Sequence, residues 1–189
     1  MTTIPRPRRS QSLLSILRDW RNASGGAAAG EFAMILPIAL FFFTGTVTFG
    51  DAIYIDRKVT LTARTVTDLV TQYSSVASTD VQTVLGASSA IVAPYSTANM
   101  VVTVSELQTD SSGNATVTWS QSLNGTKRPV GQSVALPSTI DGANVTYIFG
   151  EVAYTYTPAI GYLVTGPITL HDQTYMAPRL SPNIPCTGC

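Results

Sequence analysis

The sequence predicts an α+β fold, in which an N-terminal transmembrane helix extends into an amphipathic helix packed on a small, mostly antiparallel sheet. Three observations lead to this prediction. Residues 32–50 form an uncharged apolar run, helical periodicity continues to residue 73, and apolar residues alternate with polar ones from residue 101 onwards. The first pattern is typical of a membrane-spanning helix, the second of an amphipathic helix and the third of β-strands.

Length and charge allow one domain with an appended anchor. The chain has 189 residues, 12% of them charged, and its formal net charge is zero, so no global field favours a nucleic-acid partner. The charges are nevertheless distributed unevenly along the chain. Five arginines lie before the apolar run, together with Asp19: Arg6, Arg8, Arg9, Arg18 and Arg21. A basic flank predicts a cytoplasmic leader over residues 1–26 and an extracytoplasmic α+β domain over residues 76–189.

Residues 27–75 are predicted to form one long helix. The 19 residues of the uncharged run would span about 28 Å as a helix, which matches the hydrocarbon core of a bilayer. A cleaved secretory signal is a competing interpretation, but no typical small-residue cleavage site follows the run. A buried core helix is another, but no other segment is apolar enough to surround it. Pro37 lies near the start of the run, where a membrane helix tolerates it.

The helix is expected to continue beyond the membrane. Between Asp51 and Tyr73 the sequence contains neither glycine nor proline. An apolar stripe with helical spacing runs along this segment: Val59, Ala63, Val66, Val70 and Tyr73. A stripe of this kind needs a surface to pack on, which we expect the C-terminal domain to provide.

A second helix is predicted to open the C-terminal domain. Ser78, Thr79 and Asp80 are typical of a helix start, and Pro94 is expected to end the segment. The predicted apolar face consists of Val81, Val84, Leu85, Ser88, Ile91 and Tyr95.

Three or four strands are predicted to follow. Residues 101–107 and 115–120 read as a hairpin with one buried face. After a long loop over residues 124–144, residues 145–156 are apolar at both parities, which indicates a strand covered on both faces. A last strand is predicted at residues 168–175.

The sequence contains no recognisable catalytic or metal-binding pattern. His171 is the only histidine, and no motif places a nucleophile beside it, so a polar role on an edge strand is the expectation. The segment 110–114 resembles part of a calcium loop but lacks the terminal bidentate acid, so a turn is the better interpretation. We therefore expect no enzymatic activity, no metal and no cofactor.

Cys186 and Cys189 form a C-x-x-C pattern. A zinc site would need four ligands, and a thioredoxin-like pair would open a helix. A local disulfide is the leading interpretation for a domain outside the cytoplasm. Free thiols and cross-links to another chain stay open as alternatives.

The N-terminal spacing resembles a prepilin-type signal. Gly26 is followed by small residues, then by Glu31 and an aromatic residue, at the boundary between the basic and the apolar segments. In such signals a membrane-bound peptidase cuts after the glycine, which here would leave Ala27 as the new amino terminus. Glu31 has two open interpretations. It could lie at the membrane surface near the positive end of the helix dipole, or it could pair with the amino group of a neighbouring subunit and set the register between subunits.

The wider region resembles the TadE-like pseudopilins, minor components of the tight-adherence (Flp) pilus, which is a type IV pilus-like system. The similar motifs are Gly26, Ala27, Glu31, the Leu36 and Pro37 pair, and residues 49–54. Residues 154–158 and 175–181 are also similar to members of this family. The resemblance implies a pilin-like fold and a non-enzymatic protein that prepilin peptidase cleaves.

The same resemblance implies where the protein acts and with which partners. It would be a single-pass protein of the bacterial inner membrane with a cytoplasmic N-terminus and a periplasmic domain. Its partners would be prepilin peptidase, other pilins and pseudopilins, and the Tad secretion machinery, and it would aid assembly or regulation of an adhesion pilus. The alternative is a single-pass envelope protein that keeps its leader and binds a ligand or the cell wall through its β domain.

Overall fold

The computed structural model describes residues 26–140, 142–158 and 166–189. Most of the predicted leader therefore lies outside the described residues. The chain forms two compact units, Met1–Gly45 and Thr46–Cys189.

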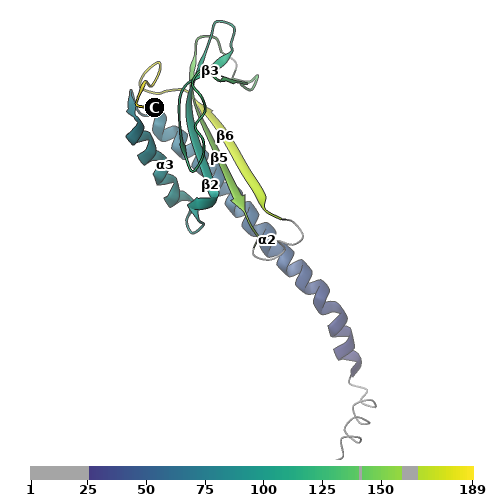
Figure 1. The fold of residues 1–189 in the computed structure, drawn as a ribbon. Coiled ribbons are helices and arrows are strands. Elements are labelled where there is room, and N and C mark those ends of the chain that lie inside the picture. Colours follow the sequence, from purple (N-terminus) through teal and green to yellow (C-terminus); the bar gives the residue numbers. More distant parts are fainter. Residues whose placement is uncertain (1–25, 141, 159–165) are drawn as a thin grey trace, which may run out of the picture. The chain divides into compact units, whose positions relative to one another are not determined.

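Helix α2 covers Gly26–Thr71, a continuous stretch of 46 residues with Pro37 inside it (Figure 1). The prediction of one long helix is confirmed, and its continuity follows from the absence of glycine and proline after Gly50. The helix ends at Thr71, where the amides of Gln72 and Tyr73 bond back to the carbonyls of Leu69 and Val70. Tyr73 therefore lies outside the helix and is 37% exposed, so its predicted place on the buried stripe is wrong.

The second unit contains a five-stranded antiparallel sheet with the strand order β4-β3-β2-β5-β6. Its strands are β2 (Met100–Thr109), β3 (Ala115–Leu123), β4 (Ser133–Val134), β5 (Thr146–Tyr156) and β6 (Ile168–Met176). A separate parallel pair joins β1 (Val76–Ala77) to β7 (Cys186–Thr187). The predicted α+β class is confirmed, whereas the predicted strand number is too low because β1, β4 and β7 are each two residues long.

Helix α3 (Ser78–Val92) and the short 3-10 helix η1 (Thr97–Asn99) precede the sheet. The Asp80 carboxylate accepts a hydrogen bond of 3.0 Å from the Ala77 amide, which satisfies one of the free donors at the start of α3. Val92 is fully buried, whereas Ile91 is only half-buried. The predicted apolar face is therefore wrong at its C-terminal end, where the face turns by one residue.

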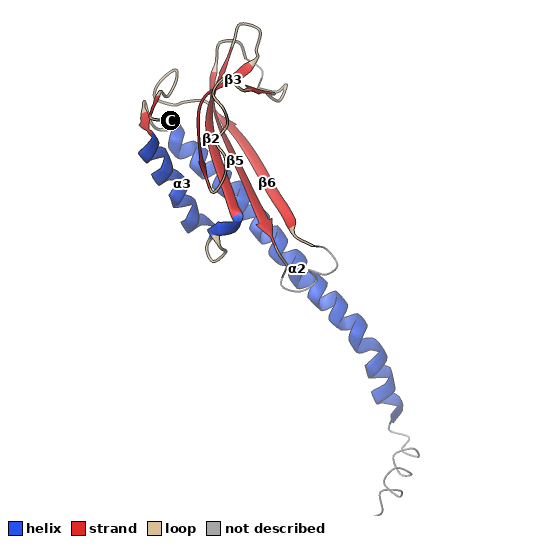
Figure 2. Cartoon of the chain, viewed as in Figure 1, coloured by secondary structure: helices blue, strands red, loops and turns tan. Residues whose placement is uncertain are grey.

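The main core lies between the helices and one face of the sheet (Figure 2). Four members of the predicted stripe are at most 1% exposed: Val59, Ala63, Val66 and Val70. They pack in one cluster with α3 and with the inward side chains of β2 and β5, such as Val104 and Ile148. The amphipathic half of α2 thus has the surface that its stripe required.

A smaller cluster lies on the opposite face of the sheet. It consists of Leu107, Ala115, Val117 and Phe149, and Val134 and Leu136 from the segment after β3 pack against it. The predicted hairpin is confirmed, because β2 and β3 pair antiparallel. The prediction that only one of its faces is buried is wrong for β2, which is covered on both faces. The interpretation of β5 as an interior strand with two covered faces is confirmed, since it lies between β2 and β6.

Candidate functional site

The described part of the first unit is a helical segment whose large apolar side chains point outwards. Phe32, Met34 and Phe41 are 64%, 73% and 70% exposed. The segment Ala28–Thr71 contains a stretch that is long and apolar enough to cross a membrane, judged by length and composition, and none of that stretch is buried within the protein. An exposed apolar helix of this length fits a single-pass membrane protein.

The polar side chain of Thr44 is satisfied within this apolar segment. Its hydroxyl donates to the carbonyl of Leu40 at 2.9 Å and lies 3.1 Å from that of Phe41. A hydroxyl with an intrahelical partner does not need water, so it costs little in a bilayer.

The structure places the three predicted N-terminal residues in the first turns of α2. Gly26 is its first residue and Ala27 its second, while Glu31 is exposed and follows the first turn. The dipole effect is strongest in the first turn, so in the uncut chain it stabilises the Glu31 carboxylate weakly. Within the described part of the chain, no side chain forms an ion pair with Glu31.

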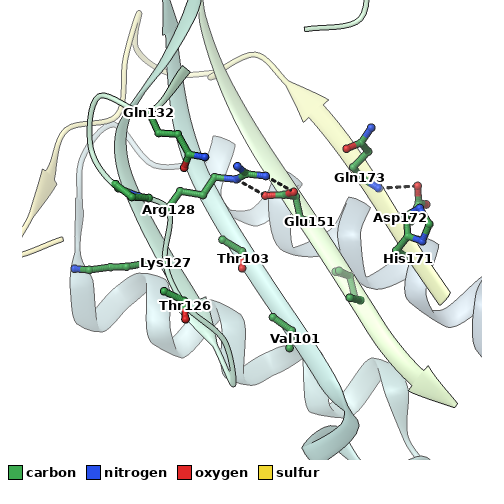
Figure 3. A pocket seen from close by; sticks show the side chains of 13 residues that line it. Val101, Thr103, Thr126, Lys127, Arg128, Gln132, Glu151, His171, Asp172 and Gln173 are labelled. Atoms are coloured by element: carbon green, nitrogen blue, oxygen red, sulfur yellow. Dashed lines mark hydrogen bonds and ion pairs between the residues drawn. The ribbon is translucent and has the colours of Figure 1, made fainter. Parts of the chain in front are cut away.

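A cavity of about 430 Å³ opens on the sheet face that α2 and α3 leave uncovered (Figure 3). Strands β2, β5 and β6 form its floor, and residues 126–129 form one wall. Arg128 makes two hydrogen bonds of 2.7 Å to the Glu151 carboxylate, and this bonding raises the pKa of the guanidinium. The guanidinium also lies 5.5 Å from the centre of the Phe149 ring.

The cavity presents charged and neutral hydrogen-bonding groups. Arg128 and Glu151 neutralise each other, and Thr103, Gln132 and Gln173 supply neutral polar groups around them (Figure 3). His171 lines the cavity from β6, an edge strand as expected. Lys127 and Asp172 add two charged groups to the lining, so this chemistry suits a polar ligand.

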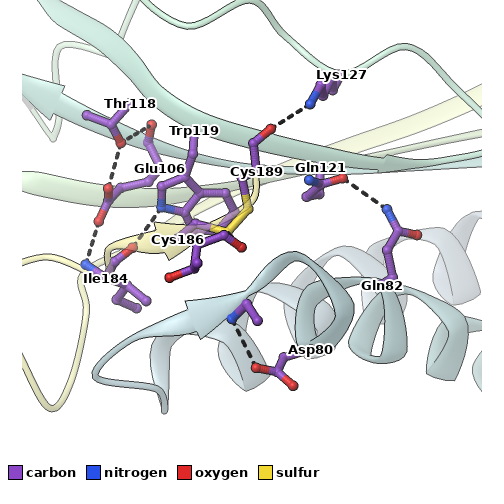
Figure 4. The surroundings of a disulfide bond; sticks show 12 residues. Asp80, Gln82, Glu106, Thr118, Trp119, Gln121, Lys127, Ile184, Cys186 and Cys189 are labelled. Atoms are coloured by element: carbon purple, nitrogen blue, oxygen red, sulfur yellow. Dashed lines mark hydrogen bonds between the residues drawn. A yellow bond between two sulfur atoms is a disulfide. The ribbon is translucent and has the colours of Figure 1, made fainter.

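Two side chains of the sheet hold the segment before Cys186 (Figure 4). Glu106, only 3% exposed, accepts a hydrogen bond from the Ile184 amide at 2.6 Å and one from the Thr118 hydroxyl at 2.5 Å. The indole of Trp119 donates to the Ile184 carbonyl at 2.7 Å. Both backbone groups of Ile184 are thus satisfied by side chains far away in sequence. Glu106 was not among the candidate residues predicted from the sequence, although a charged residue that follows Val102 and Val104 at an inward position is a usable signal.

Cys186 and Cys189 are joined by a disulfide in the structure, with their Cα atoms 5.7 Å apart. Cys186 lies in β7, which pairs with β1, and the Lys127 ammonium donates to the Cys189 carbonyl at 2.5 Å. This is the local disulfide that the sequence favoured. That the two cysteines are oxidised in the cell stays a prediction.

Asp110 uses its carboxylate within a turn. It accepts hydrogen bonds from the amides of Ser112 and Asn114 at 2.8 and 2.9 Å, and from the Asn114 side chain. These bonds lower the pKa of Asp110, with the Asn114 side chain as the largest cause. Across residues 26–140, 142–158 and 166–189, no group of three or more His, Cys, Asp or Glu side chains could hold a metal ion.

These features define a class of protein: among the described residues, one N-terminal helix able to cross a membrane continues into an α+β domain. Residues 26–68 match the model of the family described as TadE-like protein. The resemblance predicted from the N-terminal motifs is confirmed by this match over residues 26–68. The match suggests a protein associated with the Tad pilus. No curated protein and no solved structure matches the chain.

Proposed function

We propose that the chain is a minor pilin or pseudopilin that takes part in assembly or regulation of a Flp/Tad-type adhesion pilus and has no enzymatic activity. The observation that carries this proposal is the TadE-like match over residues 26–68, which begins at the first residue of α2. The exposed apolar side chains of residues 32–43 support it, because such a helix can be held by a bilayer or by the helices of other subunits.

The proposal includes a location and a set of partners. Residues 1–26 would be a cytoplasmic leader that prepilin peptidase removes, α2 would span the inner membrane once, and residues 76–189 would be periplasmic. The arginines before the apolar run support this orientation. Other pilins, pseudopilins and the Tad secretion machinery would be the partners in assembly.

Processing gives the most direct test. In cells with the cognate prepilin peptidase, the mature chain should begin at Ala27, and Gly26→Leu should abolish cleavage. Gly30→Leu is a matched control, since a Cβ at either glycine meets nothing within 4 Å, and it should still be cut. N-terminal sequencing and intact mass of the membrane-extracted protein measure the outcome. An uncut N-terminus in the wild-type chain would contradict the proposal, and a start near Asp51 would indicate an ordinary signal peptide.

We further propose that Glu31 pairs with the amino group of a neighbouring subunit. Glu31→Gln should leave membrane insertion intact and strongly reduce co-purification with other pilus components. Breaking an ion pair in a low-dielectric setting costs about 3–5 kcal/mol, which corresponds to more than hundredfold in affinity. Asp51→Asn is the control, because Asp51 is an exposed acid at the other end of the apolar run. If both variants co-purify equally well with the other pilus components, Glu31 does not pair with a neighbouring subunit and lies only at the membrane surface.

The outer cavity favours a second candidate function, that of an envelope protein whose sheet binds a polar ligand or the cell wall. A cavity of about 430 Å³ with convergent polar groups is of the usual size for such a site. A ligand-binding anchor has no need to lose its leader, so a retained leader in the processing experiment would favour this function over the first.

A further inference from the structure

Tyrosines from separate elements gather at one end of the second unit. The rings of Tyr54 in α2 and Tyr95 after α3 have centroids 6.0 Å apart. Tyr54 is 52% exposed, its neighbour Ile53 is 42% exposed, and Tyr95 is half-buried. We name Ile53, Tyr54 and Tyr95 the tyrosine surface.

Lys58 holds together α2 and the end of α3, the two elements that carry the tyrosine surface. The Lys58 ammonium donates to the carbonyls of Ile91 and Ala93, each at 2.8 Å, and lies 5.1 Å from the centre of the Tyr54 ring. The last turn of α3 and the chain leading to Tyr95 are thereby tied to α2. The relative position of Tyr54 and Tyr95 is therefore built into the packing of the second unit.

The tyrosine surface lies just beyond the uncharged run of α2. A helix rises 1.5 Å per residue, so Tyr54 is about 6 Å beyond Gly50, the last residue of that run. The headgroup layer of a bilayer extends about 5–8 Å beyond each side of the hydrocarbon core. Tyr54 therefore falls within the headgroup layer if residues 32–50 span the core, and the contact with Tyr95 places that ring at a similar depth.

The other described segments at this end carry no charge. They are residues 92–100, 152–158 and 166–170. The end of β5 belongs to the same region, because the Asp51 carboxylate contributes, after burial, to a raised pKa of Tyr156 and also acts on Tyr95. The opposite end of the sheet differs, since Asp110 lies exposed in the turn between β2 and β3. The charged residues at this end belong to α2 itself: Asp51, Asp56, Arg57 and Lys58. The neutral segments beside the exposed Tyr54 are the part that a membrane would tolerate.

We propose that the tyrosine surface docks into the headgroup layer of the bilayer that α2 spans, and so holds the second unit against the membrane. This inference rests on the membrane-spanning role of α2 in the proposed function. Tyrosine suits this layer because its ring is apolar and its hydroxyl finds polar partners there. The lipid interface is favoured over a protein partner because the surface continues directly from the apolar run.

Fluorescence quenching in vesicles tests the proposal with the full-length chain. Tyr54→Trp and Tyr95→Trp introduce reporters, and the emission of the parent chain, which contains Trp20 and Trp119, is subtracted. The chain is reconstituted into phosphatidylcholine–phosphatidylglycerol vesicles with and without lipids brominated near the headgroup end of the acyl chain. Tyr147→Trp is the control, because Tyr147 lies nine positions before Tyr156 in β5, a distance of about 30 Å along the strand.

The added emission of Tyr54→Trp and Tyr95→Trp should fall about twofold in brominated vesicles, and that of Tyr147→Trp should stay unchanged. Circular dichroism checks that each variant folds, and Ala98→Trp, at an exposed position three residues after Tyr95, replaces Tyr95→Trp if that variant does not. If Tyr95→Trp is quenched no more than the control while the chain resists alkaline carbonate extraction, docking of the second unit is overturned and the membrane anchor is upheld. If alkaline carbonate releases the chain, α2 does not span the bilayer, and the proposed docking is overturned as well. Quenching in a chain that keeps its leader would uphold docking and overturn the pilin function.

Discussion

Gly150→Ala should destabilise the second unit by about 2–3 kcal/mol, because β5 and α2 approach each other too closely for any side chain at this position. A Cβ on Gly150 would overlap the Thr67 hydroxyl and lie 3.3 Å from the Ala63 carbonyl. The Thr67 hydroxyl is held in place by a hydrogen bond of 2.7 Å to that same carbonyl. Thermal unfolding of the full-length chain in detergent should show a midpoint lower by roughly 5–12 °C.

Gly86→Ala is the matched control for this change. Gly86 lies within α3, and a Cβ there meets nothing within 4 Å, so the same substitution should stabilise the protein by about 0.5–1 kcal/mol. Adding Thr67→Ala to Gly150→Ala should recover part of the loss, since it removes the hydroxyl that overlaps the new Cβ. A Gly150→Ala variant as stable as the wild type would mean that α2 does not lie this close to the sheet.

Glu106→Leu should cost about 1–3 kcal/mol, because it leaves the buried amide of Ile184 without its acceptor. The half-buried Thr118 hydroxyl also loses the carboxylate, but it can still donate to the Glu106 backbone carbonyl, 3.2 Å away. Glu106→Gln should cost much less, since an amide oxygen can accept from the Ile184 amide while its NH2 group donates to the Thr118 oxygen. The two variants thus separate the hydrogen bonds from the charge.

Denaturant unfolding and hydrogen exchange measure this effect. The free energy of unfolding gives the cost, and exchange at Ile184 and Cys186 should accelerate most in Glu106→Leu because β7 lies directly after the held segment. Gln108→Leu, at an exposed position on the same strand, should change stability by less than about 0.5 kcal/mol. If Glu106→Leu leaves exchange at residues 184–186 unchanged, Glu106 does not hold this segment.

Errors in the predicted elements share a physical cause. Periodicity gives the direction of a helix face but not the place where the helix ends, so Tyr73 was assigned to a stripe that stops at Val70. The alternation of apolar and polar residues in β2 does not indicate that residues after β3 cover the second face of this strand. Strand β4 has two residues, too few for any period to be read.

Local sequence determined much of the protein. The lack of glycine and proline after Gly50 made α2 continuous, the uncharged run defined the part able to enter a membrane, and the motifs from Gly26 onwards led to the TadE-like family. Each of these properties depends on residues within a few turns of one another. Backbone propensity, hydropathy and short spacing are therefore sufficient to predict them.

The tertiary structure alone decided which distant residues meet. It brought Glu106 to Ile184, Gly150 to Thr67, and Tyr54 to Tyr95. These pairs are separated by tens of residues, and their contacts depend on strand order, register and the position of α2 against the sheet. Nothing in the local pattern of either partner specifies that geometry, because hydrogen bonding and close packing act across space rather than along the chain.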